Sequence, residues 1–275
     1  MAVDPFEHVM DTREWHFFES QGAYIHLPKI HLPLYGDFQI TKFMVLEIVA
    51  AALIVAIYVP LARRAATGAL PKGFLWNTFE SMLTFIRNQI AIPNIGAHDA
   101  DRFVPFLWTL FLFVLYCNLL GLFPFLGSPT ASLTVTGTLA LFSFVLIHGA
   151  AVAKMGAIGY FKSYVPHLEL PYKLNYFVVP MIVLIEAMGN FIKAFVLAVR
   201  LFANMFAGHT VLAVILLFIV MAKDSALYLF GPITLASVLG VTALSLLELF
   251  VAFLQAYIFV FLTSLFLGMT LHPSH

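Results

Sequence analysis

The chain has 275 residues, of which 62% are hydrophobic and only 10% are charged. Soluble domains carry about 25% charged residues, so this composition indicates a polytopic membrane protein. The 14 basic and 14 acidic side chains balance, which argues against a nucleic-acid surface, and the single cysteine excludes an intramolecular disulfide and a cysteine-based metal cluster.

An N-terminal arm precedes the membrane domain. Residues 1–41 are mixed polar and aromatic, are punctuated by proline and glycine, and lack the apolar core of a signal peptide. We therefore expect residues 1–41 to form a short extra-cytoplasmic arm and residues 42–275 to form the membrane domain.

Three apolar segments in the first part of the membrane domain are long enough to cross a bilayer. They cover residues 43–62, 103–122 and 132–153. The turn between the second and the third segment carries no charge, so these two spans should form a helical hairpin. After the third span we expect a basic loop with Lys154, Lys162 and Lys173, and we place His148 at the membrane interface.

An amphipathic segment lies between the first two spans. Over residues 76–92, apolar side chains such as Trp76, Leu83 and Ile90 recur at helical spacing, opposite polar ones such as Glu80 and Arg87. This pattern predicts a helix that lies in the membrane interface and does not cross it.

Two longer apolar tracts, residues 176–222 and 227–268, finish the chain. Each would form roughly 60 to 70 Å of helix, whereas the hydrocarbon slab is about 30 Å thick. Either each tract folds back as two spans, or each is one steeply tilted helix. Because no charged loop interrupts either tract, we favour two long tilted helices joined by a tight hairpin. The expected fold is an all-α polytopic membrane protein with about five crossing helices and one interfacial helix.

The basic residues predict the orientation of these helices. Arginines and lysines follow the first and third spans, whereas the turn after the second span has none. Because basic loops stay on the cytoplasmic side, the N-terminus should lie outside and the C-terminus in the cytoplasm.

Arg200 is an unexpected residue in the fourth span, because a charge at membrane depth costs about 2.5 to 3.5 kcal/mol. Glu186, Lys193 and Arg200 are spaced by seven and form one stripe of the helix, which Asn190 and Asn204 adjoin. His209 points toward the opposite flank. In the fifth span, Glu248 and Gln255 share a face, with Glu248 near the depth of His209.

Two groups of titratable side chains therefore lie on opposite sides of one permanent cation, an arrangement that suits two proton half-channels separated by an electrostatic barrier. Structural roles stay open for the same residues. Arg200 can pair with Glu186 or Glu248, Glu186 can neutralise Lys193, and His209 can simply hydrogen-bond to Glu248. Asn204 and Gln255 can act as interhelical hydrogen-bonding groups.

Two segments of the chain closely resemble subunit a of the F-type ATP synthases. They are residues 200–209 (RLFANMFAGH) and residues 248–259 (ELFVAFLQAYIF). Residues 118–124 (NLLGLFP) and 129–134 (PTASLT) are similar to that family as well. The family often carries Asp and Asn where this chain has Ser132 and Thr134, which argues against a proton relay at that turn.

The resemblance implies a role for each candidate residue. Arg200 matches the arginine that attracts the deprotonated carboxylate of a rotating c-subunit ring and blocks proton leakage. Asn204 and Gln255 match its polar neighbours. The other matches are His209, Glu248 and Asn118 in the outer access channel and Glu186 in the inner one. We add Asn190 and Lys193 to the path because they lie on the stripe of Arg200.

The resemblance also implies the setting in which the chain works. Its partners would be the c-subunit ring, the peripheral-stalk b subunits, the rest of the ATP synthase complex and the lipid bilayer, and it would need no cofactor, metal or nucleic acid. We expect no catalytic chemistry from the chain itself, because we find no nucleotide-binding loop, nucleophile arrangement or metal cluster in it. The ring would largely decide between proton and sodium coupling.

The expected location is a bacterial inner (plasma) membrane, with an organelle inner membrane as the alternative. A secondary ion transporter or channel subunit is the competing function, and a quinone-linked proton pump is a third. The Arg200-to-Asn204 motif argues against both.

Overall fold

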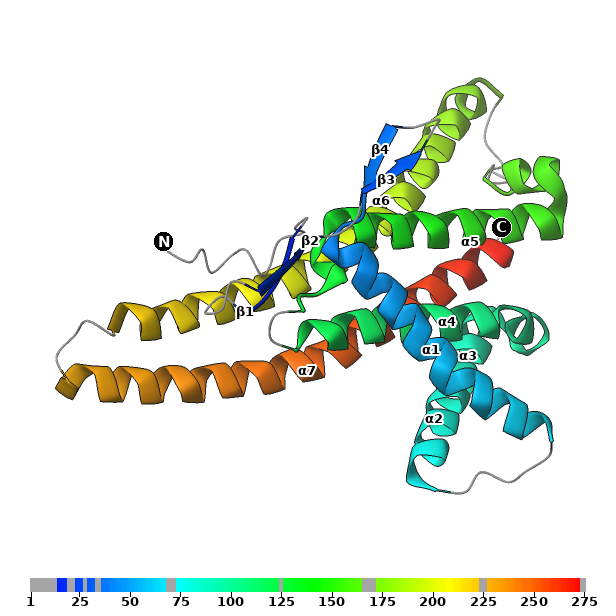
Figure 1. Cartoon of the computed structure of the whole chain (residues 1–275). Coiled ribbons are helices and arrows are strands. Elements are labelled where there is room, and N and C mark those ends of the chain that lie inside the picture. Colours follow the sequence, from blue (N-terminus) through cyan, green and yellow to red (C-terminus); the bar gives the residue numbers. More distant parts are fainter. Residues whose placement is uncertain are drawn as a thin grey trace. The chain divides into compact units, whose positions relative to one another are not determined.

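The computed structural model describes residues 14–18, 23–26, 29–32, 36–67, 73–123, 126–164, 172–222 and 227–272 (Figure 1). Helices dominate it. In chain order they are α1 (Lys42–Ala66), α2 (Phe74–Phe85), the π-helix η2 (Ile86–Ala91), α3 (Ile92–Ile95), α4 (Ala97–Gly121), the 3₁₀ turn η3 (Pro129–Ala131), α5 (Leu133–Ser163), α6 (Tyr172–Ala222) and α7 (Leu227–Leu271).

Five of these helices are long and apolar enough to cross a membrane, namely α1, α4, α5, α6 and α7. The expected fold class is thus confirmed. α6 has 51 residues and α7 has 45, and each is one helix from end to end, so the alternative in which the long tracts fold back as two spans is wrong. At about 1.5 Å per residue both helices are much longer than the roughly 30 Å hydrocarbon slab.

The N-terminal arm contains two short antiparallel hairpins, which the sequence analysis did not assign. β1 (Glu14–Phe18) pairs with β2 (Ala23–His26), and β3 (Lys29–Leu32) pairs with β4 (Gly36–Gln39). The register of the first hairpin shifts between His16 and Phe18. The first thirteen residues of the arm lie outside the described residues.

The third crossing helix continues well past the expected end at residue 153. α5 runs to Ser163, so Lys154 and Lys162 lie on a helical segment and the expectation of a loop there is wrong. Gly156 breaks the helix with a φ of 76°, a conformation that glycine adopts without steric cost. Hydropathy located the apolar part of this helix, and Lys154 and Lys162 interrupt that signal in the continuation. The side chain of Lys173 lies outside the described residues.

The amphipathic segment forms three consecutive elements, α2, η2 and α3, and not one regular helix. Part of its apolar face packs against the protein itself. Ile86 and Ile90 are fully buried, and the indole Nε1 of Trp108 on α4 donates a hydrogen bond to the carbonyl of Leu83 at 2.9 Å. The apolar periodicity in this half of the segment therefore reflects helix packing.

The chain forms two compact units, and both long helices contribute to each. The first unit comprises residues 1–70, 112–135 and 201–256, and the second comprises residues 71–111, 136–200 and 257–275. Small buried side chains let helices approach closely in the first unit, among them Ala50, Cys117 and Ala252. In the second unit Gly268 of α7 lies directly against the backbone of Asn94 in α3.

Candidate functional site

In the first unit, the end of α6 and the beginning of α7 pack side by side (Figure 1). Gly240 of α7 faces Ile215 of α6, and Gly208 of α6 faces Glu248 of α7. Since the residue numbers rise along one helix as they fall along the other, the pair is antiparallel. This register brings Glu248 to the level of His209.

His209 and Glu248 form a buried polar pair. The imidazole Nδ1 lies 3.6 Å from the carboxylate Oε1, and the two side chains are only 12% and 7% exposed. This distance is too long for a hydrogen bond, so the alternative of a simple interhelical hydrogen bond is not what the structure contains. Among the described residues, Nε2 of His209 and both oxygens of Glu248 have no hydrogen-bond partner. Buried polar atoms of this kind normally interact with protein groups or water.

A second polar network in the same unit joins α4, the turn after it and α7. Asn118 is buried and donates from Nδ2 to the carbonyl of Ala252 at 3.3 Å. The hydroxyl of Thr130 donates to Oδ1 of Asn118 at 2.6 Å and lies 2.7 Å from the hydroxyl of Ser128. Ser128 in turn donates to the carbonyl of Cys117 at 3.3 Å.

Sequence reasoning missed Ser128 and Thr130, because hydroxyl residues are common in turns and only the fold brings these two onto Asn118. The sequence analysis also assigned no role to Lys42, although this residue is buried at the start of α1, with only 2% of its surface exposed. Gln255 is buried, and its Nε2 has no hydrogen-bond partner among the described residues, whereas Asn204 is half-buried.

In the second unit, Glu186, Asn190 and Lys193 of α6 line a cavity of about 220 Å³. We call it the open cavity. Tyr160 and Tyr164 from the end of α5 line its other side. Lys193 donates to Oδ1 of Asn190 at 3.1 Å and lies over the ring of Phe266. Among the described residues Lys193 forms no ion pair with Glu186, so mutual neutralisation of these two charges is not found.

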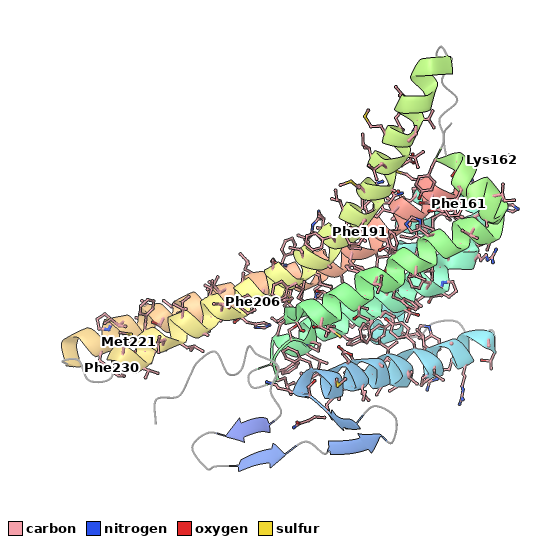
Figure 2. The ribbon with its side chains drawn as sticks, turned by 90° about the horizontal axis from the view of Figure 1, so that it is seen from above. Phe161, Lys162, Phe191, Phe206, Met221 and Phe230 are labelled. Atoms are coloured by element: carbon pink, nitrogen blue, oxygen red, sulfur yellow. The ribbon has the colours of Figure 1, made fainter. Side chains whose placement is uncertain are left out.

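Arg200 is exposed, and within the described part of the chain it takes part in no hydrogen bond or ion pair. The proposed structural pair with Glu186 is therefore not present. Arg87 differs, since its Nε and Nη2 donate to Asp101 at 2.7 and 3.0 Å. The Asp101 carboxylate raises the pKa of Arg87 above its ordinary value through these hydrogen bonds. Phe195 and Val196 on the same helix are exposed as well, and Figure 2 labels Phe191, another exposed apolar residue of α6.

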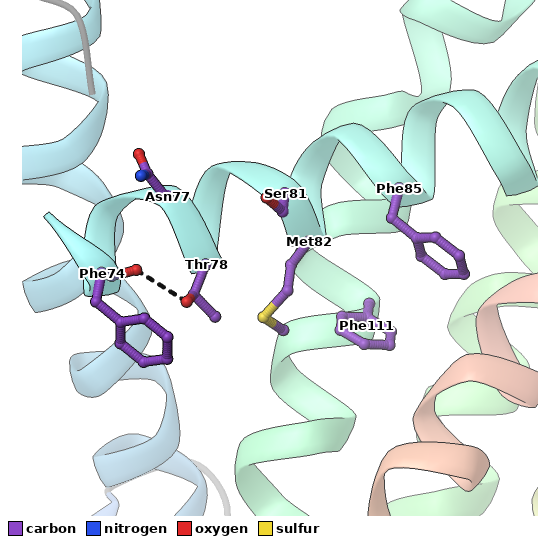
Figure 3. A pocket seen from close by; sticks show the side chains of 7 residues that line it. All are labelled: Phe74, Asn77, Thr78, Ser81, Met82, Phe85 and Phe111. Carbon is purple, nitrogen blue, oxygen red and sulfur yellow. Dashed lines mark hydrogen bonds between the residues drawn. The ribbon is translucent and has the colours of Figure 1, made fainter. Parts of the chain in front are cut away.

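A further hollow in the second unit, of about 560 Å³, lies between α2 and α4 (Figure 3). Phe74, Met82, Phe85 and Phe111 provide most of its lining, and the hydroxyl of Thr78 is bonded to the carbonyl of Phe74 at 2.9 Å. None of the residues that line it is ionisable.

Comparisons with known proteins agree with the motifs. The family model described as "ATP synthase A chain" matches residues 44–268. A protein from Anaeromyxobacter dehalogenans named "ATP synthase subunit a" is 40% identical over 93% of this chain, which spans 62% of that relative. Proteins of the same name from Chloroherpeton thalassium and Myxococcus xanthus are 39% and 37% identical, over 99% and 98% of this chain and 78% and 87% of their own lengths.

The family match covers all five of the long apolar helices, and the resemblance that the Arg200 and Glu248 motifs indicated is confirmed. The chain therefore belongs to the family of ATP synthase A chains and is a multi-pass membrane protein of that family.

Proposed function

We propose that the chain is the proton-conducting stator of an F-type ATP synthase, in which two offset half-channels meet a rotating c-subunit ring at Arg200. The observation that carries this proposal is the position of Arg200 within an apolar helix, where its guanidinium is exposed and unpaired among the described residues. A charge that is costly to bury and has no internal partner suits an external carboxylate.

The two units supply the two half-channels. His209, Glu248 and Asn118 form the outer one. The unpartnered buried atoms of His209 and Glu248 support this assignment, because such atoms need water or a proton. Glu186, Asn190 and Lys193 form the inner one, where they line the open cavity. Asn204 and Gln255 orient groups close to Arg200.

Arg200 couples the two paths to rotation. A cation within a few ångströms favours the charged form of a carboxylate, whereas lipid favours the neutral acid. Each ring carboxylate therefore loses its proton beside Arg200 and takes one up before it returns to lipid. A proton that crosses a potential of 100 mV contributes about 2.3 kcal/mol to this cycle.

The partners of the chain follow from this mechanism. The exposed apolar face of α6, which includes Phe195 and Val196 near Arg200, contacts the c-subunit ring. The peripheral-stalk b subunits hold the chain against rotation, and ATP is made on other subunits of the complex. The membrane is a bacterial inner membrane, with the N-terminus outside and the C-terminus in the cytoplasm.

Replacement of Arg200 tests the proposal in membrane vesicles that carry the assembled complex. Arg200→Ala should abolish ATP-driven proton pumping, and it should increase passive proton leak after the catalytic sector has been removed. Arg87→Ala is the matched control, because it removes an arginine that is paired with Asp101. If Arg200→Ala pumps normally with an unchanged leak, the stator mechanism is wrong.

A further inference from the structure

The end of α5 folds back on itself in the second unit. Tyr160 and His148 are twelve residues apart, which is about 18 Å along a straight helix. Nevertheless the Tyr160 hydroxyl lies 2.6 Å from Nδ1 of His148. The break at Gly156, with its φ of 76°, reverses the helix and makes this contact. Figure 2 labels Phe161 and Lys162 on the folded-back segment.

The folded-back segment carries a continuous chain of hydrogen bonds. Nδ2 of Asn190 donates to the Tyr164 hydroxyl at 3.0 Å. The hydroxyls of Tyr164 and Tyr160 are hydrogen-bonded to each other, and Tyr160 contacts His148. An amide nitrogen can only donate, so the Tyr164 oxygen accepts from Asn190, whereas either tyrosine hydroxyl can donate to the other. The Tyr160 hydroxyl can donate to Nδ1 of His148 in the tautomer that leaves this nitrogen unprotonated.

This chain of hydrogen bonds links two cavities that lie along α6 in the direction of Arg200. The open cavity contains Tyr164 and Glu186 at the wider end of the route. A second cavity, of about 20 Å³, is large enough for one water molecule and is lined by His148, Ala194 and Leu197. We call it the narrow cavity. Asn190 and Lys193 line both. Leu197 is only three residues, or about 4.5 Å of helix rise, from Arg200.

We propose that Tyr164, Tyr160 and His148 are a proton relay in the inner half-channel, which carries protons between the open cavity and the narrow cavity. The proposal rests on the proton-conducting function above and adds three residues from α5 to it. Asn190 and Lys193 are positioning residues in this relay, because Lys193 holds the amide of Asn190 and Asn190 holds Tyr164.

The relay conserves protons at each step. Water in the open cavity transfers a proton to the oxygen of Tyr164, and Tyr164 passes its own proton to Tyr160. Tyr160 passes its proton to Nδ1 of His148, and His148 releases the proton from its other ring nitrogen into the narrow cavity. Each residue ends with the number of protons it began with, and the reverse sequence carries a proton in the opposite direction.

Passive proton conductance of vesicles stripped of the catalytic sector measures the relay. Tyr160→Phe and Tyr164→Phe keep the aromatic ring and remove only the hydroxyl. Each should lower conductance about tenfold, which is less than the 100- to 10,000-fold effect of a positioned proton-transfer group because water replaces part of the path. Tyr116→Phe is the matched control, since the Tyr116 hydroxyl has no hydrogen bond to the described residues and packs in the first unit.

A purely structural role for the hydroxyls gives a different pattern of results. Tyr160→His retains a group that carries a proton but fills the site less well than Phe does. A relay therefore predicts higher conductance for Tyr160→His than for Tyr160→Phe, whereas a purely structural role predicts the opposite order. The amount of chain in the membrane, measured in parallel, corrects each conductance for assembly.

The outcomes separate the relay from the function on which it rests. If the unsubstituted complex pumps protons but both Phe variants conduct at the level of Tyr116→Phe, the relay is wrong and the stator function stands. If the unsubstituted assembled complex conducts no protons, the proposed function itself fails.

Discussion

At the scale of single residues, two glycines make room for the buried pair of the first unit. A Cβ atom at Gly208 would overlap the carboxylate of Glu248. A Cβ atom at Gly121 would lie 2.9 Å from Nε2 of His209 and 2.6 Å from Cβ of Ser128. Both positions are therefore closed to any side chain unless the polar pair moves.

Gly208→Ala should consequently displace Glu248 and lower ATP-driven proton pumping by about tenfold, which is less than the 100- to 10,000-fold effect of a positioned proton-transfer group because the carboxylate is moved and not removed. The cost to folding should be about 1 to 3 kcal/mol, as for other overpacked sites. Gly137→Ala on α5 is the matched control, since nothing lies within 4 Å of the added atom. Pumping at the control level in Gly208→Ala would mean that Glu248 does not need its present position.

At the scale of helices, close backbone approaches and a few polar contacts hold the helices of the second unit together. In the second unit, Nδ2 of Asn94 donates to the hydroxyl of Ser264 at 2.8 Å, and Gly268 lies one turn further along α7 against the carbonyl of Asn94. Lys154 on α5 donates to Asp99 on α4 at 2.6 Å. These contacts join α3 to α7 and α4 to α5.

Gly268→Ala should therefore disrupt the packing of α7 against α3, because its Cβ would overlap backbone that cannot rotate away. We expect a loss of at least about 1 to 3 kcal/mol, seen as less folded chain in the membrane and a lower unfolding temperature in detergent. Gly149→Ala, which meets no atom within 4 Å, should leave both quantities unchanged. Equal behaviour of the two variants would show that α3 yields to the added atom.

At the scale of the whole molecule, the number of crossings determines which segments share a side of the membrane. Of the five long apolar helices, only α4 lies between Arg63, at the end of α1, and Phe123, so a crossing by α4 should put these two residues on opposite sides. The single Cys117 is buried, so a Cys117→Ala background permits new cysteines to be labelled selectively.

In that background, Phe123→Cys should react with a membrane-impermeant thiol reagent added outside, and Arg63→Cys should react only after the membrane is opened. Both residues are exposed, so accessibility to the reagent is limited by the membrane alone. Labelling of both cysteines from the same side would contradict a membrane crossing by α4.

Composition, hydropathy and helical periodicity are enough to identify the membrane class, the long final helices and the central candidate residues. A charge inside an apolar helix is costly wherever the fold places it, so Arg200 stands out without a structure. Helical periodicity likewise put Glu186, Asn190 and Lys193 on one stripe, and they line one cavity. Each of these features depends on the residues of a single segment and can therefore be inferred without knowing how the segments pack.

Which polar groups contact each other depends on the tertiary structure. Thr130 reaches Asn118, and Tyr160 reaches His148, through contacts between segments that the sequence leaves unrelated. Tyrosine and threonine are ordinary residues at helix ends and turns, so their spacing in the sequence does not predict these contacts. The second contact depends on a reversal at Gly156, because a left-handed backbone angle at one residue redirects everything that follows it.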